Sequence, residues 1–347
     1  MERKSTCNSI VRSRRIFTQT CYNVLYMRRF LWVFLQFALI AGIFGFLFWG
    51  AATATDDDGK NIFTLLYEQP KRWHFLVAAF FSQLLAVVVT FIRWRWLVLT
   101  LGLECSRREA FRIGSLGFML NLAPLGIVGG DAVKAVLIAQ RNPDYKPQAV
   151  ASVLIDRFIG LLVMFIVGSI FICWTGFVFR TEILAQTFTH LVFGLTAASL
   201  IGTSLAFLPL FAKEHFERLV EKIPLAGKLA GKLTRALLLY RQHKRCLLQC
   251  CLITFCVHIP LGLSVYWIAT GLFLSVPDAA NHIMFHNVAN LTSMIPLAAG
   301  PYEWVLEQLY QMSGMNVGMG LIVALMFRLI TIFIAVLGIG YYFVKRQ

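Results

Sequence analysis

The chain has 347 residues, of which 58% are hydrophobic and 14% charged, and its mean hydropathy is +0.70. Such a composition excludes an ordinary soluble domain and predicts an integral membrane protein. The formal net charge of +15 could also indicate a nucleic-acid-binding protein, but the basic residues lie next to apolar segments and form no motif that reads bases, so we expect no nucleic-acid partner.

The chain begins with a basic polar arm, residues 1–29, which is followed by an uncharged apolar segment, residues 30–52. The apolar region of a signal peptide is usually about 7–15 residues long, so the longer segment here predicts an uncleaved membrane anchor. The small residues at 52–54 could mimic a cleavage site, which leaves cleavage as a minor alternative.

Six full spans are predicted, because a bilayer is crossed by roughly 20 apolar residues. They lie at about 30–52, 74–100, 150–176, 188–211, 246–272 and 318–344. Two further segments, at about 108–130 and 282–303, are broken by proline and glycine, and we expect both to be re-entrant. The predicted fold class is therefore an all-α polytopic membrane protein.

The basic residues are distributed unequally between the two sides of these spans. With a cytoplasmic N-terminus, 26 of the 32 Lys and Arg residues fall in cytoplasmic segments and 4 in outer ones. Because cytoplasmic loops carry an excess of positive charge, both termini are predicted to be cytoplasmic. The two re-entrant segments then enter from opposite sides, which predicts an inverted-topology repeat with halves at about 74–176 and 246–344.

A basic linker, residues 212–245, precedes the second half and carries a leucine at every fourth position from Leu225 to Leu237. This pattern favours an amphipathic helix on the cytoplasmic face of the membrane, although an ordinary connector that obeys the positive-inside rule would carry the same charges. In neither case is the linker a separate domain, so residues 30–347 are predicted to form a single membrane domain.

The re-entrant segments share a motif in which a proline is followed seven residues later by an acid. One copy reads Pro-Leu-Gly-Ile-Val-Gly-Gly-Asp and ends at Asp131, and the other reads Pro-Leu-Ala-Ala-Gly-Pro-Tyr-Glu and ends at Glu303. An arginine follows each acid in apolar surroundings, with Arg157 lying 26 residues after Asp131 and Arg328 lying 25 residues after Glu303. Broken segments in corresponding positions of two halves predict a transporter-type site near the middle of the bilayer.

Glycines precede both acids, and they are candidates for binding an anion. Gly126, Gly129 and Gly130 could turn backbone N–H groups toward a lipid phosphate, and Gly300 holds the corresponding place in the second motif. The two broken segments together would then surround one anionic head group.

The acids and arginines each allow a structural and a functional interpretation. Asp131 and Glu303 each open a helical pattern and could serve as N-caps, although an acid at membrane depth invites a second role. Arg328 has no other charge in its span and would destabilise insertion by roughly 2.5–3.5 kcal/mol, so it is predicted either to pair with Glu303 or Asp131 or to bind a phosphate or carboxylate.

Two more charged pairs lie at the ends of spans. Arg157, next to Asp156, could complete the charge of Asp131 or could extend to the membrane surface. Arg93 and Arg95 alternate with tryptophans and are predicted to anchor the interface or to receive lipid head groups as they enter the site.

The expected substrate-binding residues are therefore Gly126, Gly129, Gly130, Asp131, Asp156, Arg157, Gly300, Glu303 and Arg328. We expect no catalytic residue, metal ligand or cofactor, because the eight cysteines have no metal-binding spacing and the chain lacks the motifs of metal hydrolases and nucleotide-binding proteins.

At these residues the chain resembles the membrane domain of the lysylphosphatidylglycerol synthase family, which is also described as flippase-like. The resemblance covers about residues 75–344. It rests on Arg93-Trp-Arg95, the segment from Asn121 to Asp131, Asp156-Arg157, and the segment from Pro296 to Glu303. Relatives usually carry a glycine-rich stretch before the glutamate, where this chain has Ala-Ala-Gly-Pro-Tyr.

The resemblance implies a multi-pass protein of the bacterial plasma membrane that handles lipids. In bifunctional members the membrane domain moves an aminoacylated phospholipid and a separate cytoplasmic domain transfers the amino acid. Because this sequence stops at Gln347, just after its last span, we expect no lysyl transfer.

The leading hypothesis is thus a protein that binds an anionic or aminoacylated phospholipid and translocates it across the plasma membrane, rather than an enzyme. The alternative is a membrane component or enzyme of lipid-linked glycan assembly that uses a polyprenyl phosphate, with a synthase or glycosyltransferase as partner. A purely structural membrane scaffold is the third hypothesis.

Overall fold

In the computed structural model of the protein, the described residues are 38–55, 59, 61–122, 126–207, 233, 235–295, 297 and 299–344. Within these ranges the structure is helical, and the only extended pairing is an isolated bridge between Thr55 and Asn61. The predicted all-α membrane fold is therefore confirmed. The predicted basic arm, residues 1–29, lies outside the described residues.

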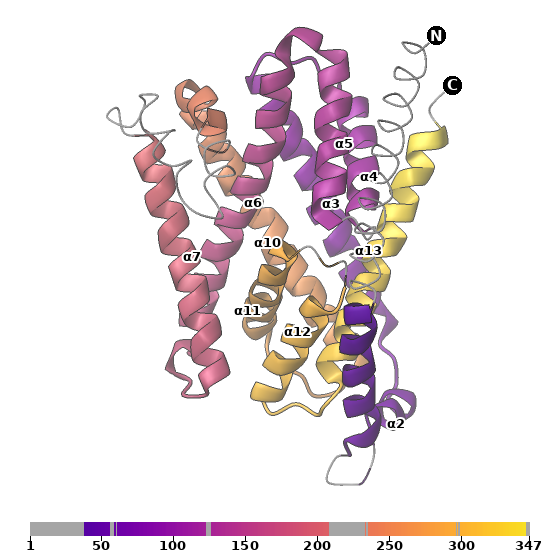
Figure 1. Ribbon diagram of the computed structural model, residues 1–347. Coiled ribbons are helices and arrows are strands. Elements are labelled where there is room, and N and C mark those ends of the chain that lie inside the picture. Colours follow the sequence, from indigo (N-terminus) through magenta and orange to yellow (C-terminus); the bar gives the residue numbers. More distant parts are fainter. Residues whose placement is uncertain are drawn as a thin grey trace, which may run out of the picture.

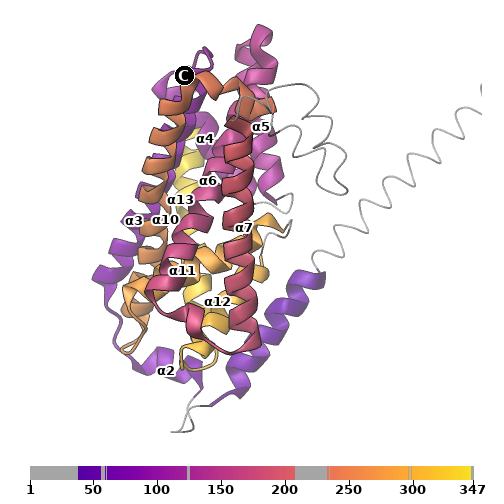
Figure 2. The same ribbon diagram turned by 90° about the vertical axis from the view of Figure 1, so that its left-hand side faces the viewer.

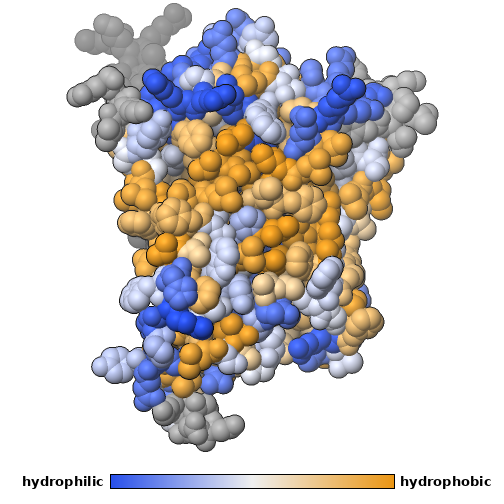
Figure 3. Space-filling model, turned by 180° about the vertical axis from the view of Figure 1, so that it is seen from behind, coloured by the Kyte–Doolittle hydropathy of each residue, from blue (hydrophilic) through white to orange (hydrophobic). Residues whose placement is uncertain are grey.

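Five helices of the described chain are long and apolar enough to cross a membrane. They are α3 (Trp73–Thr100), α6 (Lys146–Trp174), α7 (Ile183–Phe207), α10 (Lys244–Leu272) and α13 (Met319–Val344). The first predicted span is described only from residue 38, where it forms the apolar helix Ala38–Thr53. On the face seen in Figure 3, a broad band of hydrophobic side chains lies between more polar ends, as expected for helices that face lipid.

The first predicted re-entrant segment is a pair of adjacent helices, α4 (Arg107–Asn121) and α5 (Gly126–Arg141). Ser106 and Glu109 begin α4 with reciprocal side-chain-to-backbone hydrogen bonds of 3.2 and 2.9 Å, which is a capping box. Helix α5 continues 11 residues beyond the predicted end at 130, because an unbroken helical pattern extends to Arg141. The proline of the first motif lies outside the described residues.

The second predicted re-entrant segment consists of α11 (Ala279–Ala289), the short 3-10 helix η5 (Asn290–Met294) and α12 (Pro301–Met312). The α4–α5 pair lies in the upper half of Figures 1 and 2, and the α11–α12 pair lies in the lower half, where the short helix α2 (Ile62–Glu68) is also found. The two broken segments therefore occupy opposite halves of the helical bundle.

The long helices hold these two pairs in place. Helix α10 packs along α3, and buried polar side chains join them: Gln83 donates to Ser264 Oγ over 3.0 Å, and Ser264 donates to the carbonyl of Ala79 over 3.1 Å. Hydrogen bonds between buried polar groups fix the register of two helices that are otherwise joined by apolar contacts.

Most of the predicted amphipathic linker lies outside the described residues. At its described end Leu237 is 6% exposed and belongs to a buried cluster, and the Tyr240 hydroxyl donates to the carbonyl of Leu97 over 2.9 Å. This end of the linker therefore packs on α3 and does not lie free on the membrane surface.

Candidate functional site: a basic cavity between the two broken segments

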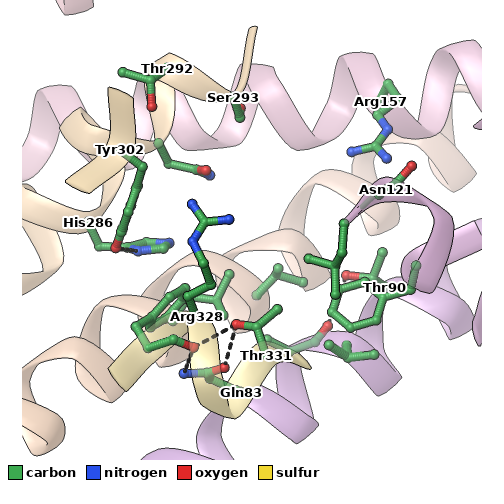
Figure 4. Close-up of a pocket in the computed structure, with 18 of the residues that line it drawn as sticks. Gln83, Thr90, Asn121, Arg157, His286, Thr292, Ser293, Tyr302, Arg328 and Thr331 are labelled. Atoms are coloured by element: carbon green, nitrogen blue, oxygen red, sulfur yellow. Dashed lines mark hydrogen bonds between the residues drawn. The ribbon is translucent and has the colours of Figure 1, made fainter. Parts of the chain in front are cut away.

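A cavity of about 370 Å³ lies where the two broken segments approach each other. Both segments contribute to its wall, together with α3, α6, α10 and α13 (Figure 4). Its uncharged polar lining comes mainly from α3, α4, α11, η5 and α13, namely Gln83, Thr90, Asn121, His286, Asn290, Thr292, Ser293, Tyr302 and Thr331.

The charged lining of the cavity is predominantly basic. Arg93, Lys134, Arg157 and Arg328 face it, and Asp156 is the only carboxylate among the described residues that line it. In Figure 4 the guanidinium groups of Arg157 and Arg328 reach into the same space from different helices. Partly desolvated cations that converge on one cavity favour an anionic ligand.

Arg157 forms an ion pair with Asp131. Its Nη2 donates to Asp131 Oδ1 over 2.9 Å, and its Nε donates to the other carboxylate oxygen, which gives a two-point contact between α6 and α5. The Arg157 side chain is 37% exposed, compared with 16% for Asp131. The arginine thus faces the cavity while the acid fixes its orientation.

Arg328 is held in the same way by Glu303. Its Nε donates to Glu303 Oε1 over 2.5 Å, with 26% of the Arg328 side chain exposed and none of the Glu303 side chain. The other oxygen, Oε2, accepts the Gly300 N–H over 2.7 Å. Both motifs therefore place an acid on the second helix of a broken segment and the matching arginine on the following long helix.

The two acids act differently from the predicted N-caps. Helix α5 begins at Gly126, so Asp131 lies inside it and does not cap it. Glu303 is the third residue of α12 and accepts the backbone N–H of Gly300, the residue in the cap position. Glu303 therefore does help to cap its helix, but from inside the first turn.

The predicted glycines lie on the two broken segments. Gly126, Gly129 and Gly130 are part of α5, and neither Gly129 nor Gly130 is among the described residues that line the cavity. A Cβ on Gly130 would lie 2.0 Å from the Gly117 carbonyl oxygen, so this glycine lets α5 approach α4 closely. Gly300 has a φ of +103°, a conformation that favours glycine.

Arg93 is buried in the bundle, contrary to the anchor role predicted for it. It is 4% exposed, and its guanidinium donates to Asp156 Oδ1 over 2.8 Å and to Thr254 Oγ1 over 3.0 Å. Arg95, two positions along α3, donates to the carbonyl of Cys105 over 3.0 Å and is not part of the cavity wall.

Lys134 is a cavity residue that the sequence analysis missed. It is 5% exposed, and its Nζ lies 5.7 Å from the centre of the Trp94 ring, within range of a cation–π contact. In the sequence it stands among the basic residues of a segment predicted to be cytoplasmic. Its position three residues after Asp131 places both on one face of a helix, and that spacing is the signal that could have identified it.

Two residues that line the cavity carry a buried polar atom without a hydrogen-bond partner among the described residues: Asn121 at Oδ1 and His286 at Nε2. The other ring nitrogen of His286 lies 3.1 Å from the Tyr302 hydroxyl. Unsatisfied polar atoms at a cavity wall are typical of a site that binds polar groups. In the described chain no group of His, Cys, Asp and Glu residues has the arrangement of a metal site.

Comparison with known protein families identifies a match to this chain. The family described as Lysylphosphatidylglycerol synthase TM region matches residues 33–338, which is nearly the whole chain. None of the curated proteins and none of the solved structures matches. The family points to a membrane protein with a lipid-related function. Together with the apolar helices, the match over residues 33–338 shows that this chain is a multi-pass member of the lysylphosphatidylglycerol synthase TM region family.

Proposed function

We propose that the protein binds an anionic or aminoacylated phospholipid and translocates it across the bacterial plasma membrane, with both termini in the cytoplasm. The observation that carries this proposal is that Arg157 and Arg328 line one cavity. Each arginine belongs to one of the two predicted halves, and each is oriented by an acid that the cavity does not reach. A lipid phosphate between them would contact both halves at once.

Such an arrangement suits alternating exposure of a site to the two leaflets. If one broken segment and its long helices rock against the other, the cavity opens first toward one side and then toward the other, as in transporters built from inverted repeats. The ion pairs Arg157–Asp131 and Arg328–Glu303 each lie within one predicted half. Neither pair would have to break during such a movement.

The test is translocation by the purified full chain in liposomes. Fluorescent phosphatidylglycerol, lysyl-phosphatidylglycerol and phosphatidylcholine would be incorporated, and their accessibility to an added quencher would be followed with time. The informative variant is Arg328→Met with Glu303→Gln, because removing the arginine alone would leave a buried carboxylate without its counter-ion and could unfold the protein.

The matched control is Arg180→Met with Glu182→Gln, which removes another Arg–Glu pair, one of 3.3 Å on the exposed surface away from the cavity. We expect the wild type and the control to move at least one of the charged lipids, and the Arg328 variant to lose at least about tenfold in rate, or ~1.4 kcal/mol in the barrier. A wild type that moves none of the three lipids, or an Arg328 variant with wild-type rates, would overturn the proposal.

A further inference from the structure

The charges around the cavity are almost balanced. Three arginines face it, and each is bound to a carboxylate: Arg93 to Asp156, Arg157 to Asp131, and Arg328 to Glu303. Lys134 is the fourth cation of the wall, and it forms no ion pair or hydrogen bond among the described residues. With all these groups ionised, the described residues of the site carry a single positive charge in excess.

Lys134 is placed to bring that excess charge to a ligand. Four charged groups act on it electrostatically, Asp156, Arg157, Asp131 and Arg93, two of each sign, and both carboxylates are already bound to arginines. A buried ammonium without a counter-ion is costly, and an anion in the cavity would remove that cost.

Gly117 in α4 leaves space for the Lys134 side chain. A Cβ on Gly117 would lie 2.6 Å from Lys134 Cε and 2.8 Å from Lys134 Cγ, so the lysine stem occupies the place where α4 has no side chain. The stem therefore packs against Gly117, the ammonium lies over the Trp94 ring, and Lys134 is one of the residues that line the cavity. A long and flexible side chain that is held in this way is pre-organised for binding.

We propose that Lys134 binds the phosphate of the ligand, and that the site takes a head group with one negative charge, so that the occupied cavity is neutral. This inference rests on the function proposed above. A phosphodiester such as phosphatidylglycerol carries one negative charge, whereas a phosphate monoester carries about −1.5 to −2 at pH 7. Lysyl-phosphatidylglycerol would bring further positive charge to this basic wall. Among the described residues that line the cavity, Asp156 is the only carboxylate, and it is already paired with Arg93.

The competing explanation is that Lys134 is structural and only packs against Trp94. The two explanations differ in what they predict for charge selectivity. If Lys134 only packs, its replacement can change stability but leaves the preference for anionic over zwitterionic lipid unchanged. If it binds the phosphate, that preference falls together with its salt dependence.

The experiment measures lipid binding to the full chain in phosphatidylcholine nanodiscs. Fluorescent phosphatidylglycerol, phosphatidylcholine, lysyl-phosphatidylglycerol and phosphatidate would be titrated at two salt concentrations. Lys134→Met removes the charge and keeps most of the length of the side chain, and Lys134→Arg keeps the charge. Lys146→Met is the matched control, since this exposed lysine lies at the start of α6 outside the cavity.

We expect wild type, Lys146→Met and, in large part, Lys134→Arg to prefer phosphatidylglycerol over the other three lipids. Lys134→Met should lose at least about tenfold of the preference for phosphatidylglycerol over phosphatidylcholine, which corresponds to ~1.4 kcal/mol. If Lys134→Met does not fold, Gly117→Ala replaces it, because the added methyl group displaces the lysine without removing its charge, and it should also lower the preference.

The results separate this inference from the proposed function. A wild type that prefers phosphatidylglycerol, with a folded Lys134→Met or Gly117→Ala variant that keeps the full preference, overturns the role of Lys134 alone. A wild type that binds phosphatidate at about pH 8 or lysyl-phosphatidylglycerol more tightly than phosphatidylglycerol overturns the single-charge rule. A wild type without any preference for charged lipid overturns both the inference and the proposed function.

Discussion

Arg93 and Asp156 form an ion pair that solvent hardly reaches, with side-chain exposures of 5% and 6%. Arg93 Nε donates to Asp156 Oδ1 over 2.8 Å, and Nη2 donates to the backbone carbonyl of the same residue over 3.1 Å. The pair therefore ties α3 to α6 in the wall of the cavity. Each charge is stabilised mainly by the other, because little water could solvate either one if its partner were removed.

Arg93→Met should destabilise the protein by about 3–5 kcal/mol, since it leaves Asp156 charged and buried without its counter-ion. Replacing both residues, as Arg93→Met with Asp156→Leu, should recover most of this loss. The measurement is the unfolding midpoint in detergent, followed by intrinsic fluorescence. A single variant that is as stable as the double variant would contradict the burial of this pair.

Gly130→Ala should separate α5 from α4, because its methyl group would lie 2.0 Å from the Gly117 carbonyl oxygen and 2.2 Å from Asn121 Oδ1. We expect a clear fall in the unfolding midpoint. Gly194→Ala in α7 is the control, since nothing lies within 4 Å of its added methyl group. That change should be neutral or stabilising by up to about 1 kcal/mol, as helix propensity predicts. Equal effects of the two changes would contradict the close approach.

Glu307→Gln should weaken the start of α13. The carboxylate accepts backbone N–H groups from Gly318 over 2.6 Å and from Leu321 over 2.9 Å, so it satisfies two donors at the beginning of that helix. The expected loss is about 1–3 kcal/mol, with faster hydrogen exchange at these two amides. Glu182→Gln on the exposed surface should change stability by less than about 0.5 kcal/mol.

Cys105, in the loop between α3 and α4, should react slowly with maleimides. Burial, assisted by the nearby charge of Glu109, raises the pKa of this thiol from 9.0 to about 11. At about pH 8 the reactive thiolate is then about 100-fold scarcer than at an unperturbed cysteine. In a variant that keeps only Cys105, labelling should accelerate at least about 100-fold on denaturation, and comparable rates before and after denaturation would contradict this.

The predicted orientation can be tested on the two exposed loops around α6. In a cysteine-free background, Glu182→Cys should be labelled on intact cells by a membrane-impermeant maleimide, and Asp144→Cys should be labelled only after the cells are opened. Both positions are exposed and lie at opposite ends of α6. The reverse pattern would mean that the N-terminal side of the membrane domain faces outward.

Much of the fold follows from composition alone, because long apolar stretches can be satisfied in lipid only as helices. The acid–arginine pairs of the site could also be anticipated, since an isolated charge inside an apolar span needs a partner and the two motifs have similar spacing. The structure contains both Arg157–Asp131 and Arg328–Glu303.

The burial of two other cavity residues was hidden by their sequence surroundings. Lys134 and Arg93 stand near other basic residues in a segment counted as cytoplasmic, where positive charges are ordinary. Their burial depends on how deeply α4 and α5 enter the bundle and on which face of α3 meets α6, and these are properties of tertiary packing. Neither property can be predicted from the local sequence alone.

Glu303 divides its two oxygens between Arg328 and the backbone of Gly300. The Glu303 carboxylate therefore connects Arg328, which lines the cavity, to Gly300, the residue with a positive φ that precedes α12. Any displacement of the Arg328 guanidinium on binding would pull on the turn at Gly300, which lies against the N-terminal helix Ala38–Thr53 through Ile43. Occupancy of the site would in this way be transmitted to the apolar helix Ala38–Thr53, which is far from Arg328 in the sequence.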